Sequence, residues 1–179
     1  DRKLRKHDVH HGNSFTELVF CLNERETAIG VLVMLTENLT EYIEQSIKTS
    51  WDFPALSNYR GETLTYRDVA ENISRLHYIF GECHVLPGDK IAVIGKNSVN
   101  WAVVYLATIT YGAVIVPGLP DFHTEDLHHI VNHSDSIFLF VSDEIYEQLD
   151  ETTMHHLKAI FSLKDFRLLF HRKTNVDQV

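Results

Sequence analysis

The most restrictive feature of this 179-residue sequence is its segment 97–120, which has no Asp, Glu, Lys or Arg in 24 consecutive residues. A short apolar run, Lys90–Ile94, precedes it behind the turn Pro87-Gly88 and is typical of a strand buried on both faces. Within the segment, apolar and aromatic residues from Trp101 to Thr108 recur at helical spacing. The stretch therefore predicts a strand followed by a helix.

Turn and cap residues divide the same stretch further. Asn97 and Ser98 offer side-chain oxygens to the first N–H groups of a helix, and Gly112 stands where a left-handed C-cap is expected. A second apolar run, 113–116, follows and is ended by Pro117. Strand, crossover helix and strand make one βαβ unit, whose two strands are predicted to be parallel neighbours.

A membrane span is the alternative for the charge-free segment, because 24 residues are enough to cross a bilayer. Polar residues are scattered through it, and glycine and proline interrupt its second half. Neither flank carries the Lys/Arg cluster that would set an orientation. The βαβ interpretation is preferred.

The remaining patterns extend this unit into a larger domain. Helices are predicted over Thr36–Ile47, from the capping-box spacing at Thr65–Asp68 to about Gly81, from an N-cap at Thr124 to about His133, and after the third strand to about Phe161 with a break near Asp150. An extended segment is predicted at 51–56, a hairpin or a turn into a short strand at 59–64, a third strand at Ile137–Val141 and a fourth at Arg167–Phe170. The fold class is α/β: a partial layered domain with a mostly parallel sheet flanked by helices.

The first 33 residues do not match this pattern. They open with the basic run Asp1–His7, and the first methionine is Met34. We predict a domain over 34–179, with 1–33 a leader, an upstream read-through or an expression remnant. An ordinary N-terminal arm is the alternative.

Composition excludes some classes of partner. The net charge of −9 opposes non-specific nucleic-acid binding, which requires a basic face. The two cysteines, Cys21 and Cys83, support neither a disulfide framework nor a zinc site and fit a reducing, cytoplasmic compartment. No secretory signal precedes the domain, since the apolar run 28–35 is far from the start and short.

A phosphate site is one hypothesis for Gly95-Lys96-Asn97, because this turn follows a strand and opens a helix. Neither G-x-x-x-x-G-K-[ST] nor G-x-G-x-x-G is present. A capped structural turn is therefore preferred.

Histidines, serines and acids were weighed as catalytic or metal-binding groups. The pair His129 and His133, with His128 beside it, has metal-ligand spacing but no H-E-x-x-H and no third ligand, and His155-His156 is similar. The serines without a nucleophile-elbow context are Ser134, Ser142 and Ser162. The acids interpreted as a solvated helix face are Asp143, Glu144, Glu147, Asp150 and Glu151. These residues assemble no catalytic, cofactor-binding or metal set.

A family resemblance adds what spacing alone does not. The runs Thr63–Asp68, Pro87–Ile94 and Tyr111–Pro117, with Asn97-Ser98 and Trp101 between them, resemble the N-terminal region of AMP-forming acyl-CoA synthetases in the adenylate-forming ligase superfamily. Bacterial long-chain fatty-acid–CoA ligases are the most similar members. The likeness covers roughly residues 36–170.

The resemblance implies a reaction for the parent protein. A fatty-acid carboxylate attacks the α-phosphate of ATP in the presence of Mg²⁺, and coenzyme A then displaces AMP from the acyl-adenylate. The family's Ser/Thr/Gly-rich loop ending in Pro-Lys-Gly is absent, as are its later nucleotide and catalytic-lysine motifs. The expectation is an inactive N-terminal fragment that holds none of these cofactors tightly, of a cytoplasmic or membrane-peripheral enzyme.

Two other functions stay open: another adenylate-forming enzyme that activates an amino acid or an aryl acid, and a non-enzymatic flavodoxin-like binding module. A truncated sheet also exposes apolar surface, so self-association is expected.

Overall fold

A computed structural model describes residues 38–172 of the chain. The chain divides between Tyr42 and Ile43, and both of its sheets belong to the C-terminal unit. The predictions for residues 1–33 and for Met34 as a start lie outside the described residues.

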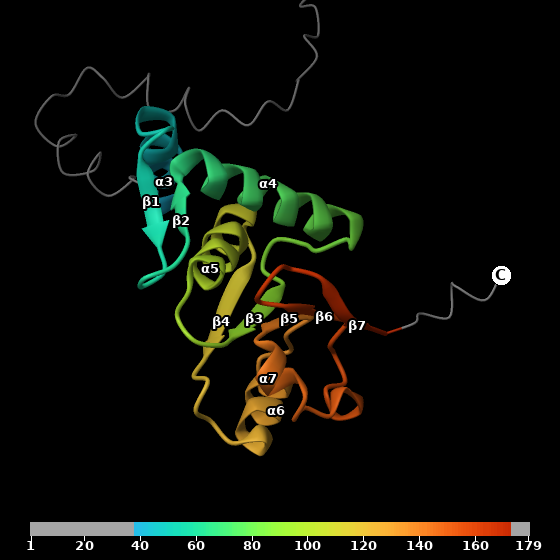
Figure 1. The fold of residues 1–179 in the computed structure, drawn as a ribbon. Helices are drawn as coiled ribbons and strands as arrows, with labels where there is room; N and C mark the ends of the chain where they lie inside the picture. Colours follow the sequence, from blue (N-terminus) through green and yellow to red (C-terminus); the bar gives the residue numbers. More distant parts are fainter. Residues whose placement is uncertain (1–37, 173–179) are drawn as a thin grey trace, which may run out of the picture. The chain divides into compact units, whose positions relative to one another are not determined.

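A five-stranded sheet in the order β4-β3-β5-β6-β7 is the centre of this unit (Figure 1). Its strands are β3 Lys90–Ile94, β4 Val114–Gly118, β5 Phe138–Val141, β6 Ala159–Ser162 and β7 Leu168–His171. The first four are parallel, and β7 runs antiparallel to β6. The predicted mostly parallel sheet is confirmed, including the pairing of β3 with β4.

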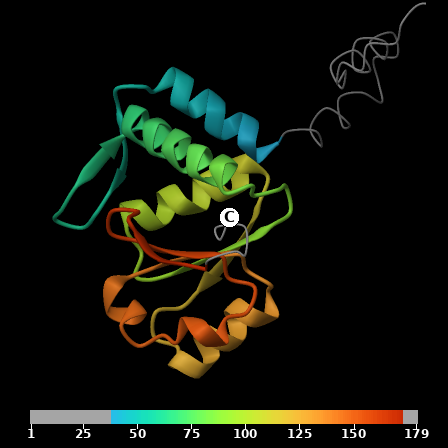
Figure 2. The same ribbon diagram turned by 90° about the vertical axis from the view of Figure 1, so that its right-hand side faces the viewer.

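Helices cover both faces of the sheet. Helices α4, Tyr66–Glu82, and α5, Val99–Tyr111, lie on one face, while α6, Thr124–His133, lies on the other (Figures 1 and 2). This follows from topology: the chain leaves β3 for β4 on one side, then returns past β3 to β5, and right-handed crossovers in opposite directions place their helices on opposite faces.

Alternate residues of the central strands feed two separate cores. Ile91 and Val93 of β3 pack with α4 and α5, whereas Ala92 and Ile94 pack with α6. All four side chains are fully buried. This is why β3 shows an unbroken apolar run rather than the alternation of a half-exposed strand.

Phe80 of α4 is the centre of an aromatic cluster on the α4/α5 face. Its ring lies 5.4 Å from that of Tyr111, 6.1 Å from Phe138 and 6.3 Å from Phe140, measured between centroids. The ring is completely buried. Helix α4 is also tied to α5 by the His77 Nε2, which donates to the Ala107 carbonyl at 2.9 Å.

The predicted helix caps are confirmed at α4 and α5. The Thr65 hydroxyl accepts from the Asp68 N–H while the Asp68 carboxylate accepts from the Thr65 N–H, which completes the capping box. At α5, the Ser98 hydroxyl accepts from the Trp101 N–H at 3.2 Å, and Gly112 closes the helix at φ 86°. Glycine is suited there because it adopts left-handed angles without strain.

A small hairpin and the part of a further helix from Ile43 onward complete the unit. Strands β1, Pro54–Ser57, and β2, Thr63–Thr65, pair antiparallel, as the extended segment and the turn predicted. Helix α3 spans Leu39–Thr49, close to the predicted range in the part that is described, and Ile47 packs against the α4/α5 core.

The membrane-span alternative is wrong. The charge-free segment forms α5 and then β4, and within residues 38–172 no helix is both long and apolar enough to cross a bilayer. Helix α5 reaches only Tyr111, because Gly112 ends it.

The sequence predicts that Pro117 ends the strand after α5, but Pro117 lies inside that strand, β4. The Val114 N–H donates to the Asp89 carbonyl just before β3. Because backbone groups alternate along a strand, the N–H of Ile115 and the nitrogen of Pro117 point to the open side of β4, away from β3. Proline lacks an N–H, and at this edge position it removes no ladder bond.

The segment after β5 is the largest error of the sequence prediction. Instead of one bent helix to Phe161 it forms a short helix α7, Asp143–Tyr146, a 3-10 turn, Glu151–Thr153, and the unpredicted strand β6. Strand β6 is buried along its whole length, so its residues show no alternation. A smaller error concerns α6: its N-cap is His123, without a side-chain bond, and Thr124 is its first residue.

Candidate functional site

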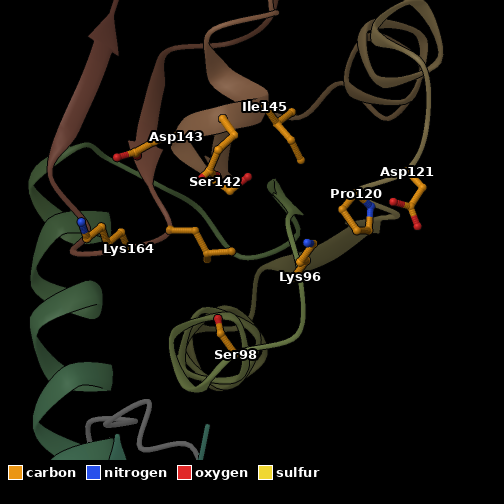
Figure 3. Close-up of a pocket in the computed structure, with 10 residues that line it drawn as sticks. Lys96, Ser98, Pro120, Asp121, Ser142, Asp143, Ile145 and Lys164 are labelled. Carbon is orange, nitrogen blue, oxygen red and sulfur yellow. The ribbon is translucent and has the colours of Figure 1, made fainter. Parts of the chain in front are cut away.

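A cavity of about 500 Å³ lies at the carboxyl ends of the parallel strands (Figure 3). Its walls come from the loops after four strands and consist of Lys96, Ser98, Pro120, Asp121, Ser142, Asp143, Glu144, Ile145, Leu163 and Lys164. The loop after β3 leads to α5 on one face, and the loop after β5 leads to α7 (Figure 1). Such a switch point between neighbouring strands is where open α/β sheets bind ligands.

Glycine at position 95 leaves room for the side chain of Leu163, which lines the cavity, beside the end of β3. A Cβ there would lie 2.6 Å from the Leu163 Cδ2 and 3.7 Å from the Ser142 Cβ. Any side chain there would force the buried Leu163 side chain to move. The residue is therefore set by the close approach of two loops that are far apart in sequence.

Asp143 is held in place at the cavity wall by two donors. The buried Ser162 hydroxyl donates to its Oδ1 at 2.6 Å, and the Arg167 Nη2 donates to its Oδ2 at 2.6 Å. The Ser162 hydrogen bond, and next the Arg167 hydrogen bond, hold the pKa of Asp143 below its usual value. Arg167 also binds Asp165, whose pKa is lowered chiefly by the Arg167 backbone N–H. The Asp143 carboxylate is therefore ionised and already paired.

Replacing Arg167 by glutamine is expected to lower stability at pH 7 more than at pH 3. A lowered folded-state pKa stabilises the fold above the ordinary aspartate value of about 4, and this contribution is lost as the pH falls through the lower folded-state value. Urea midpoints of the wild type and R167Q at both pH values measure the difference.

Arg75→Gln is the matched control, because Arg75 has only an exposed partner, Glu71, at 3.9 Å. Its effect should stay at roughly 0.5 kcal/mol or less. An R167Q difference that is equal at pH 3 and pH 7 would contradict the role of the carboxylates.

The phosphate hypothesis for Gly95-Lys96-Asn97 finds no support in the geometry. The Val99 N–H donates to the Asn58 Oδ1 at 3.0 Å, and the Trp101 N–H donates to Ser98. The first turn of α5 is thus capped by the protein's own side chains, as the preferred interpretation held. Lys96 is exposed, and its side chain points into the cavity (Figure 3).

The histidines of residues 38–172 do not gather into a metal site. The His129 and His133 rings stack with centroids 5.5 Å apart, but no group of three His, Cys, Asp or Glu within 38–172 could hold a metal ion. The His128 Nε2 accepts from the Asp150 N–H at 3.1 Å, and the His156 Nε2 lies 3.5 Å from the Asp135 carboxylate.

The acids after β5 are not one solvated helix face, which corrects the sequence interpretation. They are split between α7 and the 3-10 turn: Asp143 and Glu144 line the cavity, while Asp150 caps the turn by accepting from the Thr152 N–H at 3.0 Å. Among the serines, Ser134 bonds to Val131, and Ser162 to Asp143. No histidine hydrogen bond to any of the three serines occurs within the described range.

Sequence reasoning missed the cavity. It weighed Lys96, Ser142 and Asp143 one at a time and did not consider Asp121 or Lys164. A usable signal was present, since a polar residue lies within three positions of the end of each parallel strand and such positions meet at one edge of a sheet.

Comparison with known proteins identifies the family. The profile described as AMP-binding enzyme matches residues 43–176. Surfactin synthase subunit 2 of Bacillus subtilis (strain 168) is 27% identical over 105 residues, which cover 59% of this chain and 3% of the relative. The fatty acid–[acyl-carrier-protein] ligase ScoC of Streptomyces coeruleorubidus is 29% identical over 84 residues, which cover 47% of this chain and 16% of ScoC.

Solved structures give the same fold. The anthranilate CoA ligase AuaEII, crystallised with anthranoyl-AMP, superimposes with a TM-score of 0.64 at 16% identity, covering 70% of this chain and 25% of that one. The chain thus spans only a small part of the length of the proteins it matches. Because the profile covers most of the sequence, the chain belongs to the AMP-binding enzyme family, within the adenylate-forming ligase superfamily.

Proposed function

We propose that this chain is the N-terminal part of an ATP-dependent fatty-acid–CoA ligase, which joins a fatty acid to AMP and then to the thiol of coenzyme A. The observation that carries the proposal is the family profile over residues 43–176, which coincides with the observed three-layer unit. The similarity to ScoC supports a fatty acid as the substrate. A cytoplasmic or membrane-peripheral location is part of the proposal.

The described residues do not by themselves fit ATP and Mg²⁺. The first turn of α5 is already capped, and residues 38–172 contain no cluster of three acidic or other metal-binding side chains. In this proposal the unit supports the fold, and the nucleotide and coenzyme A are bound by other parts of the whole protein. The 179-residue chain alone is then inactive.

An amino-acid-activating enzyme is the second candidate. The similarity to surfactin synthase subunit 2, at 27% identity, favours it. Both candidates share the first step, in which a carboxylate oxygen bonds to the α-phosphorus of ATP and pyrophosphate leaves. They differ in the acid.

ATP–pyrophosphate exchange on the complete gene product tests the proposal. Exchange is expected with a long-chain fatty acid, and it should exceed that with amino acids or aryl acids by at least about tenfold, or about 1.4 kcal/mol in transition-state stabilisation. The 179-residue chain should give none.

Exchange that depends on an amino acid would replace the first candidate by the second. No exchange with any carboxylate, together with a gene that ends at Val179, would favour a binding module. A Ser/Thr/Gly-rich loop with Pro-Lys-Gly soon after Val179 would support a ligase independently of the assay.

A further inference from the structure

We propose that the connection between α7 and β6, residues 147–158, responds to pH, because a neutral histidine binds its first half to α6 and a protonated histidine binds its second half. This goes beyond the proposed function, since it concerns regulation of the unit itself and involves neither ATP nor an acid substrate.

Two histidines join the connection to α6, one in each half. In the first half, the Asp150 N–H donates to the Nε2 of His128, which lies on α6, at 3.1 Å. In the second half, the His156 Nε2 lies 3.5 Å from the carboxylate of Asp135, which follows α6. His128 is partly exposed and His156 is exposed, so both rings can exchange protons with solvent.

The two contacts need opposite protonation states. An imidazole nitrogen accepts a hydrogen bond only when it carries no proton, so the bond from the Asp150 N–H requires a neutral His128. The contact of His156 with Asp135 is an ion pair only when that imidazole is protonated. Imidazoles take up a proton as the pH falls from about 8 to about 5. Over this range the connection loses its bond at Asp150 and gains an ion pair at His156.

The carboxylates near His128 do not preserve the lost bond. They are that of Asp150 and, one turn earlier on α6, that of Glu125. The Asp150 carboxylate already accepts from the Thr152 N–H at 3.0 Å and from the Thr152 hydroxyl. A protonated His128 is attracted to this carboxylate, but such a contact replaces the bond to the Asp150 N–H rather than keeping it.

The middle of the connection is held by groups that do not titrate. The Asn132 side chain of α6 donates to the Thr153 carbonyl at 2.9 Å and accepts from the His155 N–H at 3.2 Å. Met154 and Leu157 are buried in the core that includes α6. A fall in pH therefore makes the first half of the connection more mobile and leaves the second half in place.

The half that becomes mobile is joined to the cavity wall. It follows α7, whose residues Asp143, Glu144 and Ile145 line the cavity. Asp143 is bound by Ser162 and Arg167, so the added mobility is confined to the end of α7. The pH would thus control how firmly one side of the cavity is held.

NMR of the ¹⁵N-labelled 179-residue chain between about pH 8 and about pH 5 tests both contacts. At the higher pH, the His128 ring should be the tautomer with its proton on Nδ1. As the pH falls, the Asp150 amide shift should follow the titration of that ring, and the heteronuclear NOE should fall over 147–152 but not over 153–157. The Asp150 carboxylate does not produce this shift, because the Thr152 hydroxyl, and next the Thr152 N–H, hold the pKa of Asp150 below its usual value.

Variants of His128 separate the acceptor from the charge. His128→Gln keeps an acceptor that does not titrate, so the Asp150 amide should keep its high-pH shift throughout. His128→Ala removes the acceptor, so the amide should show its low-pH shift throughout. His129→Ala is the matched control, because His129 lies on the same helix but stacks with His133. It should titrate as the wild type does.

An Asp150 amide that does not move with pH, or that moves equally in H128A and the wild type, would overturn the proposal. A movement abolished by H129A, or an equal loss of order over 147–152 and 153–157, would do the same. His156→Gln should abolish the pH-dependent shift of the Asp135 amide, and an unchanged shift would remove the second contact. None of these results bears on adenylation, which is measured on the complete gene product with ATP and pyrophosphate.

Discussion

Phe80→Ala is expected to lower the free energy of unfolding by about 3–5 kcal/mol, the cost of removing a large buried aromatic side chain. The Phe80 ring is fully buried and contacts aromatic rings from α5 and β5, so its loss leaves a cavity between helix and sheet. Since whole domains are stable by only about 5–15 kcal/mol, the variant should be marginal. Urea unfolding followed by circular dichroism measures the change.

Phe53→Ala is the matched control, because the same atoms are removed from a side chain that is 67% exposed. Its effect should stay within about 0.5 kcal/mol. If F80A does not fold, Phe80→Leu keeps part of the volume and should show a smaller, measurable loss. Equal effects of F80A and F53A would show that the aromatic cluster is not the core of this face.

Leu139→Ala is expected to cost about 2–5 kcal/mol through the core on the other face of the sheet. Leu139 is fully buried in β5 and packs with α6 residues Leu127 and Val131. Its neighbour Phe140 packs with the opposite core, so adjacent residues of one strand test separate layers. Urea unfolding again gives the change.

Leu119→Ala provides the comparison, since Leu119 is 61% exposed. It should be nearly neutral, within about 0.5 kcal/mol. An L139A variant as stable as L119A would contradict the three-layer arrangement, because only a strand covered on both faces makes both positions 139 and 140 costly.

The elements predicted well from sequence are those set by local chemistry. The Thr65/Asp68 capping box, the Ser98 N-cap and the Gly112 C-cap each involve residues within three or four positions of one another. Those caps predicted the ends of α4 and α5 closely, and the ends of the neighbouring strands could be inferred from them. Pattern and cap agreed at these places, which is what allows a single sequence to be interpreted.

Strand β6 could not be predicted in this way. Its four residues are all buried, so they show neither the alternation of a half-exposed strand nor turn residues close on both sides. Its place is fixed by parallel pairing with β5, twenty or so residues earlier in the chain. Such non-local pairing overrides local preference.

The cavity was missed for a related reason. Asp143 is held by Ser162 and Arg167, which are distant in sequence, and Lys96 and Ser142 line one cavity because the strand order places β3 beside β5. A correct strand order would have predicted that the loops after β3 and β5 lie next to each other. Without β6 and that order, each residue was judged by its immediate neighbours.

The proline inside β4 makes the two margins of the sheet unequal. Along β4, Ile115 presents the one outward N–H between Val114 and Pro117, so the carbonyls of an incoming strand find almost no N–H to donate to them. Strand β7, Leu168–His171, contains no proline and keeps its donors. If copies of this chain join by strand addition, they can therefore grow from the β7 margin only, which limits the product to pairs rather than open-ended ribbons.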